Sequence, residues 1–264
     1  MLSVSQLRSY MFCPRQLYLK YVVKAPEFYK PELKQGLVGH YVRQELALRY
    51  GKVLEKIKKP ISEKEILQLL REELDKILEE LPSIYREKLK GEKQDTEKLK
   101  KELENELLAL AKRTKQVIKE TGYLGKKLKE YLTPWKTEMN VKSEKLGIRG
   151  RIDAVYREDD RIFPVEIKTG RPPTYVWDSD KLQLAAYAMM LEERFDTNIP
   201  HGFVEYTQVN EKRPIVIDAK LRRQVFDVRD KVLDIIEGRA CPQPKDTKKC
   251  ESCGFYEVCY GSVV

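Results

Sequence analysis

The 264-residue sequence lacks any run of about 18 apolar residues, which excludes a membrane-spanning helix of ordinary length. The stretch from Met1 to Gln6 has neither a basic region nor a long apolar run, so no secretory signal is expected. Internal repeats and low-complexity linkers are absent as well. These absences favour a cytoplasmic protein with no membrane contact.

Histidine and cysteine are scarce, with two histidines (His40 and His201) and five cysteines in the chain. Because cytoplasmic thiols stay reduced, the cysteines are better explained as metal or cluster ligands than as disulfides. With only one other histidine present, little competes with His40 for the role of an imidazole ligand. Charge is plentiful: 51 Lys and Arg against 42 Asp and Glu give a net charge of +9, which permits a polyanionic partner.

The first part of the chain, residues 1–50, carries apolar side chains at helical spacing. Ser3 or Ser5 can cap a first helix, and Pro14 should break that helix into two short ones. A further helix is expected from Pro31 to about Tyr50, and it carries His40.

Residues 51–131 are dominated by Lys, Glu and Leu and predict two or three long helices, broken near residues 81–83 and near Gly91. We interpret this segment as a helical insertion without a chemical role, because it contains neither His nor Cys. A solvated amphipathic hairpin is the favoured interpretation, and an arm that grips DNA or a partner is the alternative.

Residues 132–240 switch to the alternation typical of strands and predict an α/β core with a mixed sheet flanked by helices. The remaining residues, 241–264, form a cysteine-bearing segment. Within the core we expect strands at residues 137–141, 147–156, 161–168, 202–208 and 214–217, and helices at residues 178–195, with Asp178 or Ser179 as cap, and 220–237.

The most informative feature is a pair of adjacent strands that carry Asp153 and Glu166-Ile167-Lys168. Each acid interrupts an apolar strand, and Glu166 and Lys168 share a face because residues two apart on a strand point the same way. Burying these charges is costly unless something compensates them, and a divalent cation would do so. A structural ion pair between Lys168 and one acid is the alternative.

Two further motifs could belong to the same site as this pair of strands. Gly36 and His40 lie one turn apart on the expected helix, and the glycine would let another backbone come close. Gln183 and Tyr187 are four residues apart on a later helix and share one face, either above the same site or as an ordinary half-buried surface.

The ordered set resembles the RecB-like branch of the PD-(D/E)xK nucleases, whose fold is a restriction-endonuclease-like core. That branch shows Gly-x-x-x-His, Gly-x-x-Asp, Glu-x-Lys followed by Thr-Gly, and Gln-x-x-x-Tyr. The matching positions here, in the same order, are Gly36 to His40, Gly150 to Asp153, Glu166 to Lys168 with Thr169-Gly170, and Gln183 to Tyr187.

The cysteines allow two ligand sets. Zinc could be held locally by Cys241 together with the C-terminal triplet, and spacing alone favours this set slightly. An iron–sulfur cluster could instead be held by Cys13 and the same triplet, with Cys241 spare. The triplet consists of Cys250, Cys253 and Cys259.

The resemblance favours the second set, because RecB-like nucleases with an iron–sulfur module have one cysteine upstream of the histidine motif and three near the C-terminus. In this sequence, Cys13 stands in the matching Cys-Pro-Arg-x-x-Tyr context, and the implied cofactor is a 4Fe-4S cluster. No Walker-type Gly-x-x-x-x-Gly-Lys-Ser/Thr motif is present, so an attached helicase is not expected. The size is similar to that of the CRISPR-associated exonuclease family, the fourth Cas protein, from whose compact members the long insertion departs.

The resemblance also implies the chemistry. His40, Asp153, Glu166 and the carbonyl of Ile167 would bind Mn²⁺ or Mg²⁺, and Lys168 would orient water or stabilise the phosphorane. Gln183 and Tyr187 would position the DNA. The catalytic set implied in this way consists of Asp153, Glu166, Lys168, Gln183 and Tyr187.

The expected activity is that of a DNA exonuclease, with some endonuclease activity, that trims DNA before CRISPR spacers are integrated. Its partners would be single-stranded DNA, or DNA with single-stranded ends, and the CRISPR integrase proteins. Tyr175 and Trp177 could stack on unpaired bases or pack on the core. A general repair or viral nuclease of the same fold, and a non-catalytic iron–sulfur or zinc protein that binds DNA, are the alternatives.

Overall fold

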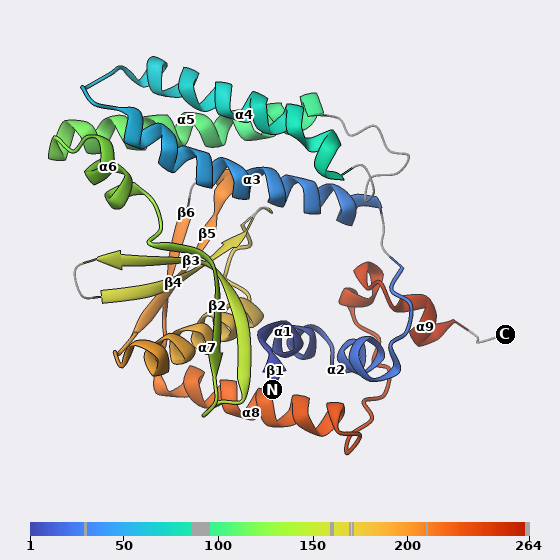
Figure 1. Cartoon of the computed structure of the whole chain (residues 1–264). Helices are drawn as coiled ribbons and strands as arrows, with labels where there is room; N and C mark the ends of the chain where they lie inside the picture. The colour runs from blue at the N-terminus through green and yellow to red at the C-terminus, as the bar shows by residue number, and fades with distance from the viewer. Residues whose placement is uncertain are drawn as a thin grey trace.

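The computed structural model describes residues 1–28, 31–85, 96–158, 161–168, 170, 172–209 and 211–261. A central sheet separates two layers of helices, and the C-terminal segment forms a small module with α2 (Pro14–Tyr18) at one side (Figure 1). Within the described residues, no helix is both long and apolar enough to cross a lipid bilayer.

In the described part of the chain, a six-stranded mixed sheet forms the centre of the fold. β3 pairs antiparallel with β2 and β4, whereas β4 pairs in parallel with β5, which confirms the predicted mixed sheet. A two-residue first strand, parallel to β3, was not predicted. The strands are β1 (Leu2–Ser3), β2 (Lys136–Ser143), β3 (Ile148–Glu158), β4 (Arg161–Lys168), β5 (His201–Tyr206) and β6 (Glu211–Val216).

Of the predicted strands, β4 alone has the expected bounds; β2 and β3 end two residues later than predicted, and β5 and β6 differ at the ends that face each other along the chain. β5 ends at Tyr206, and Thr207–Val209 form a 3-10 turn where the strand was expected to continue to Gln208. β6 begins at Glu211 rather than Pro214, because its charged first residues pair with β5. An edge strand with charged residues lacks a clear apolar alternation, which is why the pattern missed its start.

Helices α1, α7 and α8 pack with the sheet around the largest hydrophobic core. Ser3 caps α1 in a capping box with Gln6, as the sequence predicts. The cap of α7 is wrong in the prediction: Trp177 holds that position without a side-chain hydrogen bond, and Asp178 and Ser179 lie inside the first turn. The bounds are α1 (Val4–Phe12), α7 (Asp178–Phe195) and α8 (Ala219–Ile236).

The other layer consists of α3 and the helices of the insertion, which share a core of their own (Figure 1). Its largely aliphatic residues come from all four helices, so the insertion is a packed unit and not a solvated hairpin. The helices are α3 (Pro31–Lys56), α4 (Glu63–Tyr85), α5 (Thr96–Thr121) and α6 (Gly125–Leu132).

Two helix ends in this layer correct the prediction. α3 continues past Tyr50 to Lys56, because the buried Val53 and Leu54 extend its apolar face. α4 is not broken near residues 81–83: it runs through Pro82 to Tyr85, although a proline there removes one backbone hydrogen bond of the helix. The break expected near Gly91 lies outside the described residues.

Residues 14–28 and the C-terminal segment lie side by side. Pro14 breaks the first helix as predicted and begins α2 (Pro14–Tyr18), which a π-helical turn follows. The C-terminal segment contributes a 3-10 turn (Lys248–Ser252) and α9 (Tyr256–Tyr260). The backbone N–H of Phe28 donates to the carbonyl of Gly254 at 2.8 Å, which ties the two segments together.

Candidate functional site

Strands β3 and β4 bring Asp153 and Glu166 together. In this antiparallel pair Ala154 lies opposite Val165. Asp153, just before Ala154, and Glu166, just after Val165, are therefore neighbours across the two strands. Asp153 Oδ2 accepts a hydrogen bond of 2.9 Å from the backbone N–H of Ile167, which fixes the carboxylate across the strand pair.

Lys168 lies between two acids. Its Nζ is 2.8 Å from Glu166 Oε1 and 3.0 Å from Asp180 Oδ1, so Glu166 and Lys168 share a face as strand alternation predicts. Asp180 is buried in the first turn of α7 and was missed by the motif comparison. Its position, one turn before Gln183 on the same helix face, is the signal that could have found it.

Glu166 is the most strongly perturbed acid of the site. It is only 4% exposed, and its pKa is raised to about 7: burial is the main cause, Lys168 opposes the shift, and the Asp153 carboxylate adds to it. Two acids forced this close in a buried place repel each other. The arrangement therefore favours a cation between or beside them.

Gln183 and Tyr187 face this pair from α7. Gln183 Nε2 donates to Glu166 Oε2 at 2.7 Å and to the Tyr187 hydroxyl at 3.1 Å, and that hydroxyl donates to the Arg151 carbonyl at 2.7 Å. Gln183 Oε1 is buried and has no hydrogen-bond partner among the described residues. The helix approaches the strand closely because Gly150 has no side chain: a Cβ there would lie 2.7 Å from the Tyr187 ring.

These residues line an open hollow of about 310 Å³. Helix α1 supplies its other wall, including Arg8, whose side chain is 45% exposed and lies 3.8 Å from Asp180 Oδ1. The motif comparison did not single out Arg8. A basic side chain at the mouth of an acidic hollow can bind a phosphate that enters it.

The structure describes the backbone of the predicted histidine ligand but not its side chain. His40 belongs to α3, but its side chain is not among those described. Without it, the described residues contain no group of three or more His, Cys, Asp or Glu side chains that could hold a metal ion. The carboxylates of Asp153 and Glu166 and the carbonyl of Ile167 are oxygen donors of the kind that Mg²⁺ and Mn²⁺ prefer.

Tyr175 and Trp177 lie in the loop before α7, where their side chains are 81% and 62% exposed. Packing on the core, one of the two predicted roles, is therefore wrong for both residues. Neither lines the hollow around Asp153 and Glu166.

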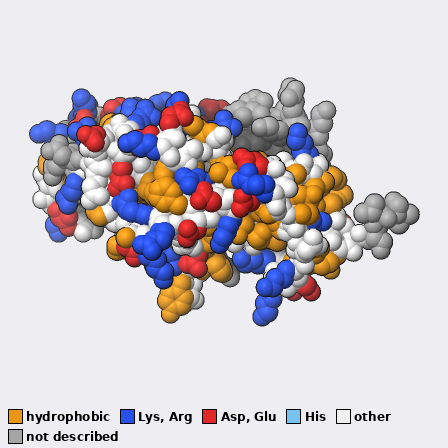
Figure 2. Space-filling view, turned by 90° about the horizontal axis from the view of Figure 1, so that it is seen from below, with side chains coloured by type: hydrophobic (Ala, Val, Ile, Leu, Met, Phe, Trp, Pro, Cys, Tyr) orange, Lys and Arg blue, Asp and Glu red, His pale blue; other side chains and the backbone are white. Residues whose placement is uncertain are grey.

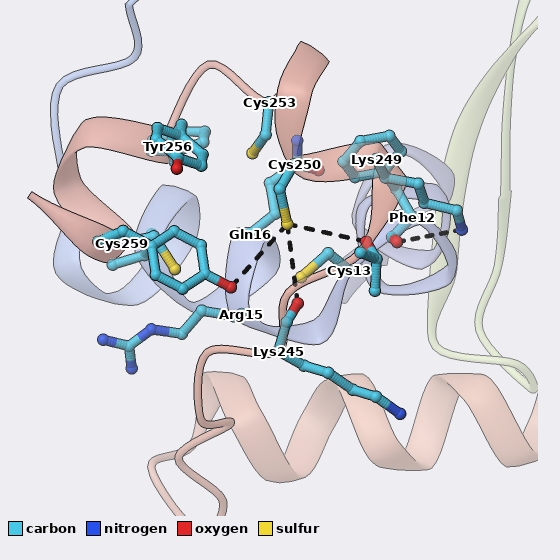
Figure 3. A pocket seen from close by; sticks show the side chains of 14 residues that line it. Phe12, Cys13, Arg15, Gln16, Lys245, Lys249, Cys250, Cys253, Tyr256 and Cys259 are labelled. Carbon is cyan, nitrogen blue, oxygen red and sulfur yellow. Dashed lines mark hydrogen bonds between the residues drawn. The ribbon is translucent and has the colours of Figure 1, made fainter.

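The structure gathers Cys13 and the C-terminal triplet Cys250, Cys253 and Cys259 around one small pocket. Their side chains point into a common space between α2 and the C-terminal segment (Figure 3). Burial raises the pKa of the Cys253 thiol, and the nearby Cys13 and Cys250 sulfurs raise it further. Four soft thiolate donors in one pocket suit an iron–sulfur cluster or zinc.

Cys241 is not part of this pocket. It is exposed, and its Sγ lies 3.9 Å from Arg15 Nη1. Cys241 therefore lies apart from the triplet, whereas Cys13 lines the same pocket as the triplet.

A mixed sheet that presents an Asp, a Glu-x-Lys and a Gln-x-x-x-Tyr at one hollow has the design of a PD-(D/E)xK nuclease. A family model described as the PD-(D/E)XK nuclease superfamily matches residues 1–260, and the chain belongs to that superfamily.

Within the superfamily, the chain is similar to CRISPR-associated exonucleases. It is 33% identical over 129 residues to the Cas4/endonuclease Cas1 fusion of Myxococcus xanthus and 34% identical over 137 residues to the exonuclease Csa1 of Saccharolobus solfataricus. It is 25% identical over 121 residues to the exonuclease Cas4 of Francisella tularensis subsp. novicida. These matches cover 46%, 49% and 46% of this chain, but only 22%, 44% and 60% of the respective relatives.

Proposed function

We propose that the protein is a metal-dependent DNA nuclease of the Cas4 kind. The observation that supports this most directly is the convergence of Asp153, Glu166 and Lys168 in one hollow, with Gln183 in contact with Glu166. A buried acid with a raised pKa beside a second acid is unfavourable in a purely structural role, and a divalent cation would compensate it.

Asp153, Glu166, the Ile167 carbonyl and His40 would hold this cation. His40 is included because Gln44 and Ala47, one and two turns further along α3, line a cavity together with Asp153 and Ile167. When bound, Mn²⁺ or Mg²⁺ would lower the pKa of a water and neutralise charge on the scissile phosphate.

The protein's own groups supply the remaining functions. Lys168 Nζ, held by Glu166 and Asp180, places a positive charge where negative charge develops on the phosphate. The hydrogen bonds from Gln183 fix Glu166 and Tyr187, which keeps the acid oriented toward the hollow. Arg8 at the mouth of the hollow binds a neighbouring phosphate of the DNA.

The cysteine pocket supports a 4Fe-4S cluster. Cys13, Cys250, Cys253 and Cys259 line it together, and a 4Fe-4S cluster takes one thiolate on each of its four irons. It would join α2 to the C-terminal segment.

The relatives support a role in CRISPR adaptation, the processing of DNA before spacers are integrated. Several of them combine a Cas4 exonuclease and a Cas1 endonuclease in one chain, so a Cas1-like integrase is the proposed partner. The proposed substrate is DNA that is single-stranded or has single-stranded ends. The net charge of +9 adds an attraction to phosphates that does not depend on sequence.

One experiment tests the activity. Anaerobically purified protein is incubated with end-labelled single-stranded and double-stranded DNA, with Mn²⁺, Mg²⁺ or EDTA. Cleavage of the single strand with either metal, and none in EDTA, supports the proposal. Absence of cleavage under all conditions by folded, iron-loaded protein would rule it out and favour a non-catalytic protein that binds DNA.

A further inference from the structure

The helical insertion and the sheet enclose a second cavity, of about 140 Å³. Helices α3 and α5 line it on one side and strands β2, β3 and β4 on the other. Asp153 and Ile167 line this cavity as well as the hollow that holds Glu166 and Lys168. The cavity of the insertion therefore opens directly beside the proposed catalytic centre.

Four acids and two arginines line this cavity, and three of the acids are paired with basic side chains other than Arg113. Three of its acids are neutralised by basic side chains, at N–O distances of 2.7, 2.7 and 3.2 Å: Glu106 by Arg43, Glu138 by Arg151, and Glu205 by Lys212. Asp153 remains as the proposed ligand of the cation. Among the residues that line the cavity, Arg113 is then the cation left to meet an incoming negative charge.

Arg113 lies on α5 and is half-buried. Within the described residues it makes no hydrogen bond or ion pair, and its positive charge acts on two phenols that line the cavity: burial raises the pKa of Tyr50 and of Tyr156, and Arg113 opposes both shifts. A second group also lacks a partner, because Thr207 Oγ1 is buried in the cavity wall without a hydrogen bond to any described residue. A half-buried guanidinium that no carboxylate neutralises can bind a phosphate.

The rest of the wall is apolar and sized for one ring. Leu46, Ala47, Leu110, Leu132 and Pro134 contribute aliphatic surface, and Tyr156 contributes an aromatic ring. An engineered protein cavity of roughly 150 Å³ takes up a benzene ring, so a cavity of this size fits one base and not a base pair.

We infer that the cavity of the insertion is a nucleotide subsite of the nuclease, which takes one unpaired nucleotide next to the scissile phosphate. The base lies against the apolar wall, its phosphate binds Arg113, and the Thr207 hydroxyl is available to a polar edge of the base. The inference deepens the proposed function and rests on it for the position of the scissile phosphate. It also gives the insertion a role in substrate binding that the absence of His and Cys had argued against.

The first test compares Arg113→Gln with Lys112→Gln, a control that removes an exposed charge from the neighbouring position of the same helix. The affinity of the full chain for a fluorescent single-stranded oligonucleotide is measured in EDTA across a range of salt concentrations. The Arg113 variant should bind about 5-fold or more weakly and show a salt slope smaller by about 0.7, as expected for one lost phosphate contact on a single strand. The Lys112 variant should resemble the wild type. Equal affinities and slopes for the two variants, or no DNA binding by the wild type, would overturn the inference.

The second test addresses the base. Ala47→Phe fills the cavity from α3, and oligonucleotides with one abasic position are scanned along the strand. One abasic position should weaken binding to the wild type and have no effect on the Ala47 variant; equal effects on both proteins would refute a base in the cavity. Cleavage with Mn²⁺ is measured in parallel. If the wild type never cuts DNA but these differences in binding appear, the nuclease proposal fails and the subsite survives; if it cuts and the differences are absent, the subsite alone fails.

Discussion

Asp180 Oδ1 lies 3.0 Å from Lys168 Nζ, which is also 2.8 Å from Glu166 Oε1: Glu166 comes from the strand of Lys168, and Asp180 comes from α7. The lysine is thus fixed by two elements at once. Since Asp180 is buried, its charge is balanced by Lys168 and, more distantly, by Arg8.

Replacing Asp180 by Asn should slow cleavage by roughly 10- to 100-fold while DNA affinity stays within about 2-fold, because the lysine loses its second anchor but the binding groups remain. Steady-state kcat and the affinity measured in EDTA separate the two effects. Asp178→Asn is the matched control, an exposed acid two residues away that pairs with Lys181 at 2.9 Å. Asp180→Glu should recover part of the rate, which a general loss of stability would not allow.

Lys168→Ala should lower the rate of cleavage by at least about 10²-fold, to an effectively inactive protein, with DNA binding nearly unchanged. The charge it removes is needed when negative charge builds up on the phosphate, and less so in the ground state. Product formation with Mn²⁺ is the measurement, and Lys181→Ala on α7 is the control for loss of a nearby lysine. Cleavage retained by the Lys168 variant would count against this site.

The sequence predicted which side chains lie together at the candidate site better than it predicted their surroundings. Motif spacing found Asp153, Glu166 and Lys168 because strand alternation and a short turn determine which side chains meet. Asp180 and Arg8 lie outside the four motifs: Arg8 reaches the hollow, and Asp180 reaches Lys168, through the packing of a helix against the sheet. Periodicity identified the insertion as helical, but its burial against α3 depends on tertiary contacts that local spacing does not encode.

In metal-free protein, Glu166 should make stability depend on pH. Its folded pKa of about 7 lies above its ordinary value of 4.5, so the folded state favours the neutral acid. The contribution of neutral Glu166 to the stability of the folded state is fully present below about pH 4.5 and is lost as the pH rises through about 7. The free energy of unfolding in EDTA should therefore fall by up to about 3 kcal/mol between about pH 5 and pH 8.

Denaturant titrations at each pH measure this effect, and Glu166→Gln isolates it because the amide does not titrate. The difference in the free energy of unfolding between wild type and variant should shrink or reverse when Mn²⁺ is added at the higher pH, since the cation stabilises the ionised acid. A difference that stays constant with pH in EDTA would show that Glu166 is ionised throughout this range.

The two candidate ligand sets of the cluster make opposite predictions. Cys13→Ala removes a side chain from the pocket shared with the C-terminal triplet, whereas Cys241→Ala changes an exposed thiol outside that pocket. The Cys13 variant should lose most of its iron and sulfide, along with the broad violet absorption of the anaerobically purified protein. It should also melt at a lower temperature, because the link between α2 and the C-terminal segment is weakened.

The Cys241 variant should keep its iron, colour and melting temperature. Iron, acid-labile sulfide and zinc are measured on both variants and the wild type, together with thermal unfolding. Iron retained by the Cys13 variant and lost from the Cys241 variant would contradict the ligand set. A colourless wild type with stoichiometric zinc would instead show that the four sulfurs bind a single zinc ion.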